Sequence, residues 1–513
     1  MTNPGAAMKM LITYAICIPL AIFVGYLLTN PLDYGTLGFL GLVIALIISP
    51  IFIKWHYPIM VFGLGCPAYV FFLKGNPPLW QVVTMLSLGI AIVERAMSSE
   101  RRFISVPVIT RPLLFLLAVV IMTAEMTGGI GMHTLGAAVG GGQKYMWVFL
   151  GIAMYFAITS RQIPKEKRKL YLILFYLSCV PAFISDLFPV LPSPLNYINL
   201  FFPPESTTTV EGSTFAFNTT RLGAFSVAAG GIISFMLARY GLGGIFLRGG
   251  GRTVLFLFMF SLTLLGGFRS WLINSLCLLT MLFFLEKLYR TRLLLVFLIG
   301  GMLGIGLLVA FANKLPSNFQ RSLTFLPLPL DPQVVAEAQG SSDWRHEMWA
   351  DLWPQVPGYL LVGKGYALSA QDFQTIDSGG IFYGGSSAAS LDKSQQNLAL
   401  SGDYHNGPLS ILMPFGLWGA IGFLWLELAA VYVLYRNYKY GDPELKTVNA
   451  LLMVSAGYLC FSFVTIYGAF NVDVGQFSKW VGFSVALNGG MCGPKRELAG
   501  TVRIKPMPRP MAA

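Results

Sequence analysis

The chain has 513 residues, of which 55% are apolar and only 11% are charged, and its formal net charge is +12. Soluble globular domains carry about 25% charged residues, so this composition excludes an ordinary soluble protein. The six cysteines show no CxxC spacing, which excludes a disulfide-rich scaffold. The basic residues form short clusters between apolar segments, so the charge indicates a membrane protein and not a nucleic-acid partner. The sequence predicts an all-α polytopic membrane protein.

Apolar stretches of about 20 residues can cross the hydrocarbon core of a bilayer as helices. On this basis we expect about 14 transmembrane helices. The first stretch is too long for a signal peptide and lacks a small-residue cleavage site, so we interpret it as a span. The expected spans are Met8–Leu28, Tyr34–Ile53, Tyr57–Leu73, Leu79–Val93, Pro112–Met126, Tyr145–Thr159, Leu170–Leu191, Ala224–Tyr240, Thr253–Gly267, Trp271–Leu285, Leu293–Ala312, Pro408–Tyr435, Val448–Phe470 and Lys479–Met491.

The distribution of basic residues predicts the orientation. Most of the 35 lysines and arginines fall in every second connection, in clusters such as Arg161–Lys169, Lys287–Arg292 and the tail after Lys495. Positive residues favour the cytoplasmic side, so we expect both termini in the cytoplasm. The opposite connections hold only ten basic residues, namely Lys74, Lys144, Arg221, Arg269, Lys314, Arg321, Arg345, Lys364, Lys393 and Lys479.

One outward connection, Asn313–Tyr404, is long and polar enough to form a loop domain. Within it, Ser341–Trp353 is expected to be a short helix capped by Ser341 or Ser342. Its apolar face either lies at the membrane–water boundary or covers the top of the bundle. The expected organisation is N-terminal membrane helices at 1–190, membrane helices with arginine-bearing outer ends at 191–312, the loop domain at 313–405, C-terminal membrane helices at 406–491 and a cytoplasmic tail at 492–513.

No motif for metal or nucleotide chemistry occurs in the sequence. There is no HExxH, no Asp-x-Asp and no Gly-x-x-x-x-Gly-Lys-Ser/Thr segment, so we expect neither a metal nor a cofactor. Among the four histidines, His405 alone combines an outward position with a span directly behind it. His56 is expected on the cytoplasmic side, His133 in a Gly-rich connection and His346 on the short loop helix.

The segment that begins at His405 reads His-Asn, nine residues and Gly-x-x-Gly, and it resembles the signature of the bacterial O-antigen ligase and O-antigen polymerase superfamily. The resemblance covers about Thr220 to Asn471. Two positions depart from the family pattern. Phe268 stands where a small residue usually precedes the arginine at position 269, and Ser226-Val227 stands where Pro-Asn often follows the segment that begins at Arg221. The other segments that agree in order and side are Arg221-Leu-Gly-Ala-Phe225, Gly267-Phe-Arg-Ser270, Arg345 with Trp349, and Leu361-Val-Gly-Lys-Gly-Tyr366.

The resemblance implies a membrane glycosyltransferase of the cell inner membrane, with its active site on the periplasmic side. Members of the family transfer a glycan from an undecaprenyl-pyrophosphate donor to a hydroxyl of a lipid or glycan acceptor. Arginine remains charged and binds phosphate oxygens through a planar fork of donors. Histidine, with an ordinary pKa near ~6.5, accepts a proton at neutral pH. The resemblance therefore assigns proton acceptance to His405 and substrate binding to Arg221, Arg269, Arg345 and Asn406. Asp403, two residues before the histidine, is a weaker candidate for orienting the imidazole, on its proximity in sequence alone.

Three alternatives remain open on the sequence. Arg345 is as well placed to pair with Asp343, Glu347 or Asp351 as to bind phosphate. Ligation of a finished polysaccharide and polymerisation of repeat units use the same donor and the same base. A polysaccharide flippase would instead show internal repeats and ionisable groups near mid-membrane, whereas the charged candidates here gather at the outer ends of spans.

Overall fold

The structure is a computed structural model that describes residues 4–27, 29, 34–98, 102–131, 140–188, 191–203, 222–368 and 402–494. This part of the chain is all-helical and contains no strand, as expected. Its α-helices are α1 (Pro4–Leu27), α2 (Tyr34–Gly63), α3 (Leu79–Met97), α4 (Pro107–Thr127), α5 (Gly142–Ile158), α6 (Arg168–Tyr176), α7 (Phe183–Asp186), α8 (Gly223–Phe246), α9 (Gly250–Thr263), α10 (Arg269–Leu285), α11 (Leu293–Phe311), α12 (Ser317–Ser322), α13 (Pro332–Leu352), α14 (Val356–Tyr359), α17 (Gly407–Tyr440), α18 (Lys446–Thr465) and α19 (Phe470–Asn488).

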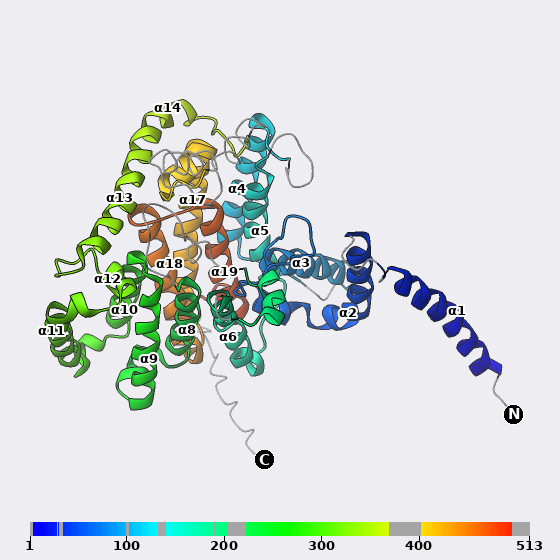
Figure 1. Ribbon diagram of the computed structural model, residues 1–513, viewed down its shortest axis with the longest axis horizontal. Helices are drawn as coiled ribbons and strands as arrows, with labels where there is room; N and C mark the ends of the chain where they lie inside the picture. The colour runs from blue at the N-terminus through cyan, green and yellow to red at the C-terminus, as the bar shows by residue number, and fades with distance from the viewer. Residues whose placement is uncertain are drawn as a thin grey trace, which may run out of the picture.

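Eight segments of the described chain are helical, long and apolar enough to cross a membrane, and three shorter apolar helices accompany them. The helix α11 is the most apolar, and its side chains are almost all exposed, as expected for a lipid-facing helix. In Figure 1 the helices α4, α5, α17, α18 and α19 run alongside one another, and α1 projects away from them. The eight long segments are Leu46–Gly63, Leu79–Met97, Pro107–Thr127, Lys165–Asp186, Gly223–Phe246, Leu293–Lys314, Gly407–Tyr440 and Pro443–Thr465.

Four of the expected spans differ from the structure. The separate spans Tyr34–Ile53 and Tyr57–Leu73 are wrong, because α2 is continuous through the polar residues between them and ends at Gly63. The expected span Leu170–Leu191 is divided into α6, a 3-10 turn and α7. The charge pattern places Lys479 in an outer connection, and this prediction is wrong, because the residue lies within α19, which begins nine residues earlier at Phe470.

Small and flat side chains bring α5 and α19 together. A side chain at Gly151 of α5 would meet the backbone of Gly475 in α19 at 3.2 Å, which is the close approach that small residues allow between membrane helices. Near the other end of α19, the ring of Phe483 stacks on that of Phe175 with centroids 3.9 Å apart. These contacts fix α5, α6 and α19 in the core.

The bundle has two distinct ends. At the first, which we call the site end, α17 and α19 begin, and the amide of Phe470 donates to the hydroxyl of Ser410 at 3.0 Å. At the opposite end, which we call the basic end, α17 ends, and Arg168 pairs with Asp442 at 2.7 Å. The cluster Arg161–Lys169 lies there, so the structure separates this basic cluster from the residues around His405.

The helix α17 is broken near its start. Gly416 adopts φ 59° and ψ −155°, a conformation available to glycine and strained for other residues. The carbonyl groups of Met413 and Pro414 thus accept hydrogen bonds from the amides of Lys364 and Gly365, at 2.7 and 3.0 Å. The Gly-Lys-Gly segment of the long loop therefore lies directly against the broken part of α17.

The loop helix is longer than the sequence analysis predicted. It is α13, and it begins at Pro332 with Asp331 as its cap, whose side chain accepts from the amide of Gln333. Proline suits the first turn of a helix because its missing N–H would be unpaired there. The predicted caps Ser341 and Ser342 therefore lie inside the helix.

The apolar face of α13 covers the beginning of α17. Met348 and Leu352 are buried and pack in one cluster with Tyr404, Leu409 and Met413. In Figure 1, α13 and α14 lie beside the end of the bundle where α17 starts. Of the two positions expected for this face, the structure favours the one that covers the bundle.

Candidate functional site

A cavity of about 970 Å³ opens at the site end, between α8, α10, α13 and α18. It is large enough for part of a sizeable ligand, since binding pockets typically measure about 300–1,000 Å³. Three of the residues singled out by the sequence, Arg269, Arg345 and His405, line this one cavity. Its apolar wall includes Ile233, Leu237, Phe260, Trp271, Leu278, Leu279 and Trp480.

Arg269 is the first residue of α10 and is held by α13. Its Nη2 atom donates to the carbonyl of Ala338 at 3.1 Å and to the hydroxyl of Ser342 at 2.9 Å. A cation at a helix N-terminus is opposed by the helix dipole, whereas an anion is favoured there. The guanidinium and the first turn of α10 together thus favour an anionic group in the cavity.

Arg345 reaches the same cavity from α13. Its Nε atom is buried and has no hydrogen-bond partner within the described residues, and its guanidinium lies 5.5 Å from the ring of Trp344. Burial lowers the pKa of Arg345, and the nearby positive charge of Arg269 lowers it further. Two arginines close enough to repel each other in a partly buried cavity are stabilised when an anion lies between them.

His405 is held in an unusual backbone conformation directly before α17. Its φ is +49°, in the left-handed region that residues other than glycine rarely occupy. On one side, Trp349 donates from Nε1 to the carbonyl of Tyr404 at 2.8 Å. On the other side, the side chain of Asn406 caps α17 by accepting from the amide of Leu409 at 3.0 Å. These two hydrogen bonds fix the backbone that presents the imidazole to the cavity.

The imidazole of His405 lies between aromatic rings and charged groups. The ring of Tyr467 lies 5.3 Å from it and that of Trp344 5.9 Å, centroid to centroid. Nδ1 is 3.9 Å from a carboxylate oxygen of Asp403, too far for a hydrogen bond. Burial lowers the pKa of His405; Asp403 opposes this effect, while Arg345 and Lys144 add to it. The neutral imidazole, which can accept a proton, is therefore favoured.

The other residues named by the sequence lie as follows. Asn406 is outside the group that lines the cavity and uses its side-chain oxygen as the cap of α17. Asp403 is within 3.9 Å of His405 and is partly exposed. Arg221 lies outside the described residues, but the next residue, Leu222, donates its amide to the carbonyl of Leu265 at 3.2 Å.

Three residues of the cavity were not singled out as site residues from the sequence. Arg321 lines it and pairs with Glu337 at 3.1 Å, and both side chains are buried. His346 lines it from α13, with its ring 5.4 Å from that of Trp349. Tyr467 lines it beside His405, and burial raises its pKa to about 12. Only tertiary structure brings these residues together, although the sequence already places His346 on the outward loop helix.

The arrangement combines fixed cations, a neutral imidazole and an apolar wall in one cavity. Within the described residues, no three His, Cys, Asp or Glu side chains are grouped so that they could hold a metal ion. Cations can stabilise a leaving phosphate group, and a positioned imidazole can accept a proton from a hydroxyl. The cavity is thus suited to the displacement of a phosphate by an alcohol.

A comparison with protein-family models gives one match: residues 254–424 match the family described as O-antigen ligase. The matched segment runs from α9 into α17 and contains Arg269, Arg345 and His405. It excludes Arg221. Comparison with curated proteins and with solved structures gave no match.

Proposed function

Starting from the O-antigen ligase domain at residues 254–424, which makes this chain a member of the O-antigen ligase and polymerase superfamily, we propose the following reaction. The protein transfers a glycan from an undecaprenyl-pyrophosphate donor to a hydroxyl of a lipid or glycan acceptor, in the synthesis of a cell-surface polysaccharide. The observation that carries the proposal is that Arg269, Arg345 and His405, far apart in sequence, line one cavity of about 970 Å³.

Arg269 and Arg345 bind the pyrophosphate of the donor in this proposal. Their guanidinium groups are near enough for one to lower the pKa of the other, and Arg345 has a buried Nε without a partner among the described residues. A pyrophosphate supplies the negative charge that both lack. When the bond between the anomeric carbon and the pyrophosphate breaks, charge develops on the leaving oxygen, and the two cations stabilise it. Arg221 has the same role by resemblance.

His405 accepts the proton of the acceptor hydroxyl. Asp403 lies on the Nδ1 side of the ring, so it favours the tautomer with the proton on Nδ1 and leaves Nε2 to act as the base. The acceptor oxygen then forms the bond to the anomeric carbon, and undecaprenyl pyrophosphate leaves. Asn406 supports this step by fixing the start of α17.

The site end faces the periplasm in this proposal, and both termini lie in the cytoplasm. The support is electrostatic: the basic cluster Arg161–Lys169 lies at the opposite end of the bundle, and such clusters favour the cytoplasmic side. The lipid-linked donor thus enters the cavity from the outer leaflet, with its chain along the apolar wall.

Reconstituted protein tests the reaction directly. The protein in lipid nanodiscs receives an undecaprenyl-pyrophosphate oligosaccharide with a lipid A-core acceptor, or with the donor alone, and products are identified by mass spectrometry. Glycosylated acceptor together with free undecaprenyl pyrophosphate is the expected result for a ligase. Elongated donor in the reaction without acceptor identifies a polymerase.

The matched pair His405→Gln and His346→Gln tests the assignment of the base, since both histidines line the cavity. We expect the first substitution to abolish most turnover and the second to preserve it. Movement of intact donor across vesicle membranes without any new glycosidic bond would contradict the proposed chemistry and identify a flippase.

A further inference from the structure

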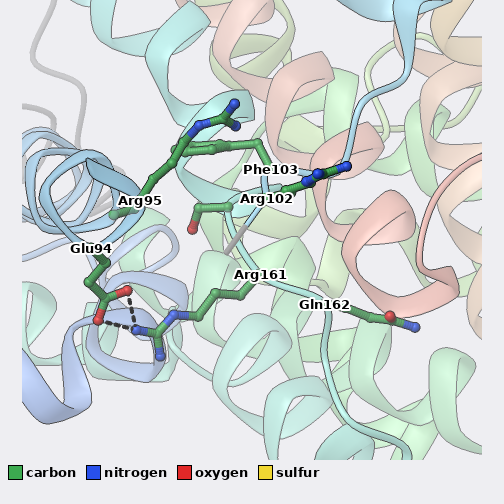
Figure 2. A pocket seen from close by; sticks show the side chains of 8 residues that line it. Glu94, Arg95, Arg102, Phe103, Arg161 and Gln162 are labelled. Carbon is green, nitrogen blue, oxygen red and sulfur yellow. Dashed lines mark hydrogen bonds and ion pairs between the residues drawn. The ribbon is translucent and has the colours of Figure 1, made fainter. Parts of the chain in front are cut away.

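A second cavity, of about 340 Å³, lies at the basic end of the bundle, remote from His405. It is formed by the last turns of α3, the segment before α4 and the segment after α5. Figure 2 shows Arg95, Arg102 and Arg161 around it, with Glu94 beside Arg161. The residues that line it are Ala91, Glu94, Arg95, Arg102, Phe103, Ser160, Arg161 and Gln162; we call them the arginine pocket.

The arginine pocket carries an excess of positive charge. Glu94 is its one carboxylate against three guanidinium groups. Both oxygens of Glu94 accept from Nη2 of Arg161, at 2.5 and 2.6 Å, and one of them lies 3.9 Å from Nε2 of His56. The carboxylate is thus turned toward Arg161 and not toward Arg95 or Arg102. A cavity lined by charges of one sign attracts ions of the other sign.

The walls of the arginine pocket are held in place by contacts beneath it. The hydroxyl of Tyr57 donates to the carbonyl of Arg161 at 3.3 Å, and the amide of Ile163 donates to a carbonyl of α19 at 2.9 Å. The guanidinium of Arg95 lies 5.7 Å from the ring of Phe103, which restrains it by a cation–π contact (Figure 2). Little ordering is therefore needed when an anion binds.

Apolar side chains of α3 lie directly beside the charged ones. Ile92 and Val93 are 54% and 56% exposed, and Met97 is 83% exposed. They flank Glu94 and Arg95 on the same helix end. A free phosphate ion gains nothing from such a surface, whereas the acyl chains of a lipid bury it. The neighbouring apolar surface thus favours a ligand with an anionic head and a hydrocarbon tail.

We propose that the arginine pocket binds the phosphate of an anionic glycerophospholipid, such as phosphatidylglycerol, whose acyl chains lie along the end of α3. The site is separate from the glycan-transfer cavity, and it holds α3 against the segments before α4 and after α5. If these arginines only set the orientation of the protein in the membrane, neither a pocket nor a preference among lipids would be required.

Titration of lipid onto the full-length protein in detergent, followed by native mass spectrometry, tests the proposal. The probes are phosphatidylglycerol, phosphatidylcholine and inorganic phosphate. The variant carries Arg95→Gln and Arg102→Gln, and the control carries Arg111→Gln and Arg248→Gln, two exposed arginines outside the pocket with the same loss of charge.

We expect saturable binding of phosphatidylglycerol in preference to phosphatidylcholine. Each basic residue contributes about fivefold to the affinity for anionic lipid, so the pocket variant should bind roughly 30-fold more weakly. The control should change less than about twofold. Melting temperatures measured in phosphatidylcholine establish that each variant is folded, and Gln162→Ala serves as a milder pocket variant if the double one is not.

Equal binding of the two lipids, or an equal loss of affinity in the control, would overturn the proposal and leave the arginines with a topological role. Displacement of phosphatidylglycerol by inorganic phosphate at similar concentration would also overturn it, because the acyl chains would then contribute nothing.

Discussion

Replacing Arg269 by lysine separates the charge of this side chain from its shape. In the structure, Nη2 donates to Ala338 and to Ser342, both on α13. A guanidinium has five N–H groups, so two of them hold α13 and three remain for phosphate oxygens. A lysine ammonium has three N–H groups on one nitrogen, so keeping both contacts with α13 would leave a single N–H group for the pyrophosphate of the glycan donor.

Loss of one donor directed at developing charge lowers the rate by roughly 10²–10³-fold. The lysine variant loses two of the three N–H groups available to phosphate. We therefore expect turnover to fall by at least about 10²-fold, which corresponds to a rise of about 3 kcal/mol in the activation free energy. Arg269→Ala should lose as much or more. Ser342→Ala is the matched control, because it removes one contact of Nη2 and none of the N–H groups available to phosphate. One net hydrogen bond of about 1 kcal/mol predicts about a fivefold loss.

The assay is kcat for glycan transfer by purified protein at saturating acceptor, with melting temperatures to establish equal folding. The expected order of loss is Ser342→Ala, then Arg269→Lys, then Arg269→Ala. Near-normal turnover by the lysine variant would refute the role of the planar guanidinium group of Arg269. A serine variant as impaired as Arg269→Ala would assign the arginine to holding α13 and not to binding the donor.

Three further predictions concern the base, the loop and the orientation. His405→Gln should lower turnover by about 10²–10⁴-fold. In the wild type, burial holds the imidazole pKa below its usual 6.5, so turnover should persist at pH 6.5 and fall on further acidification. A pH-independent rate would contradict the role of His405 as the base. Gly363→Ala should lower the melting temperature and reduce the free energy of unfolding by about 1–3 kcal/mol, because the new Cβ would meet a backbone carbonyl of α17. Gly340→Ala, which has open space around it, should not lower the melting temperature, and equal effects of the two substitutions would refute the packing argument. In a cysteine-free background, an impermeant reagent should label Glu347→Cys and not Lys167→Cys in cells with a permeable outer membrane, and the reverse pattern would invert the orientation.

Hydropathy predicted helices where apolar character was uniform. The expected span Leu293–Ala312 agrees closely with α11, because every residue of this helix is compatible with lipid. It failed where polar residues lie inside a helix. His56 was interpreted as part of a connection, yet it is fully buried in α2 and its Nδ1 lies 2.8 Å from the hydroxyl of Ser87. Lys479 lies inside α19 in the same way, and a window average of hydropathy cannot recognise a polar group that neighbouring helices cover.

The site was only partly predictable. The order of the segments around Arg269, Arg345 and His405 indicated that they meet at one end of the bundle, because each borders an outward span end or lies in the outer loop. The start of α13 was missed although Asp331-Pro332 is a strong helix-start signal. The hydrogen bond between Trp349 and Tyr404 joins residues 55 positions apart, and no spacing rule relates them.

The break in α17 makes the histidine end of this helix mechanically separate from its longer remainder. Beyond Gly416 the hydrogen-bond ladder is interrupted, and the amide of Leu417 donates to Leu360 of the covering segment at 2.8 Å. The short outer piece, Gly407–Phe415, is therefore joined by hydrogen bonds to Lys364 and Gly365 and not by a continuous helical ladder to the rest of α17. The backbone that carries His405 is thus anchored by contacts with the loop region, such as the hydrogen bond from Trp349 to Tyr404, and not by the longer remainder of α17.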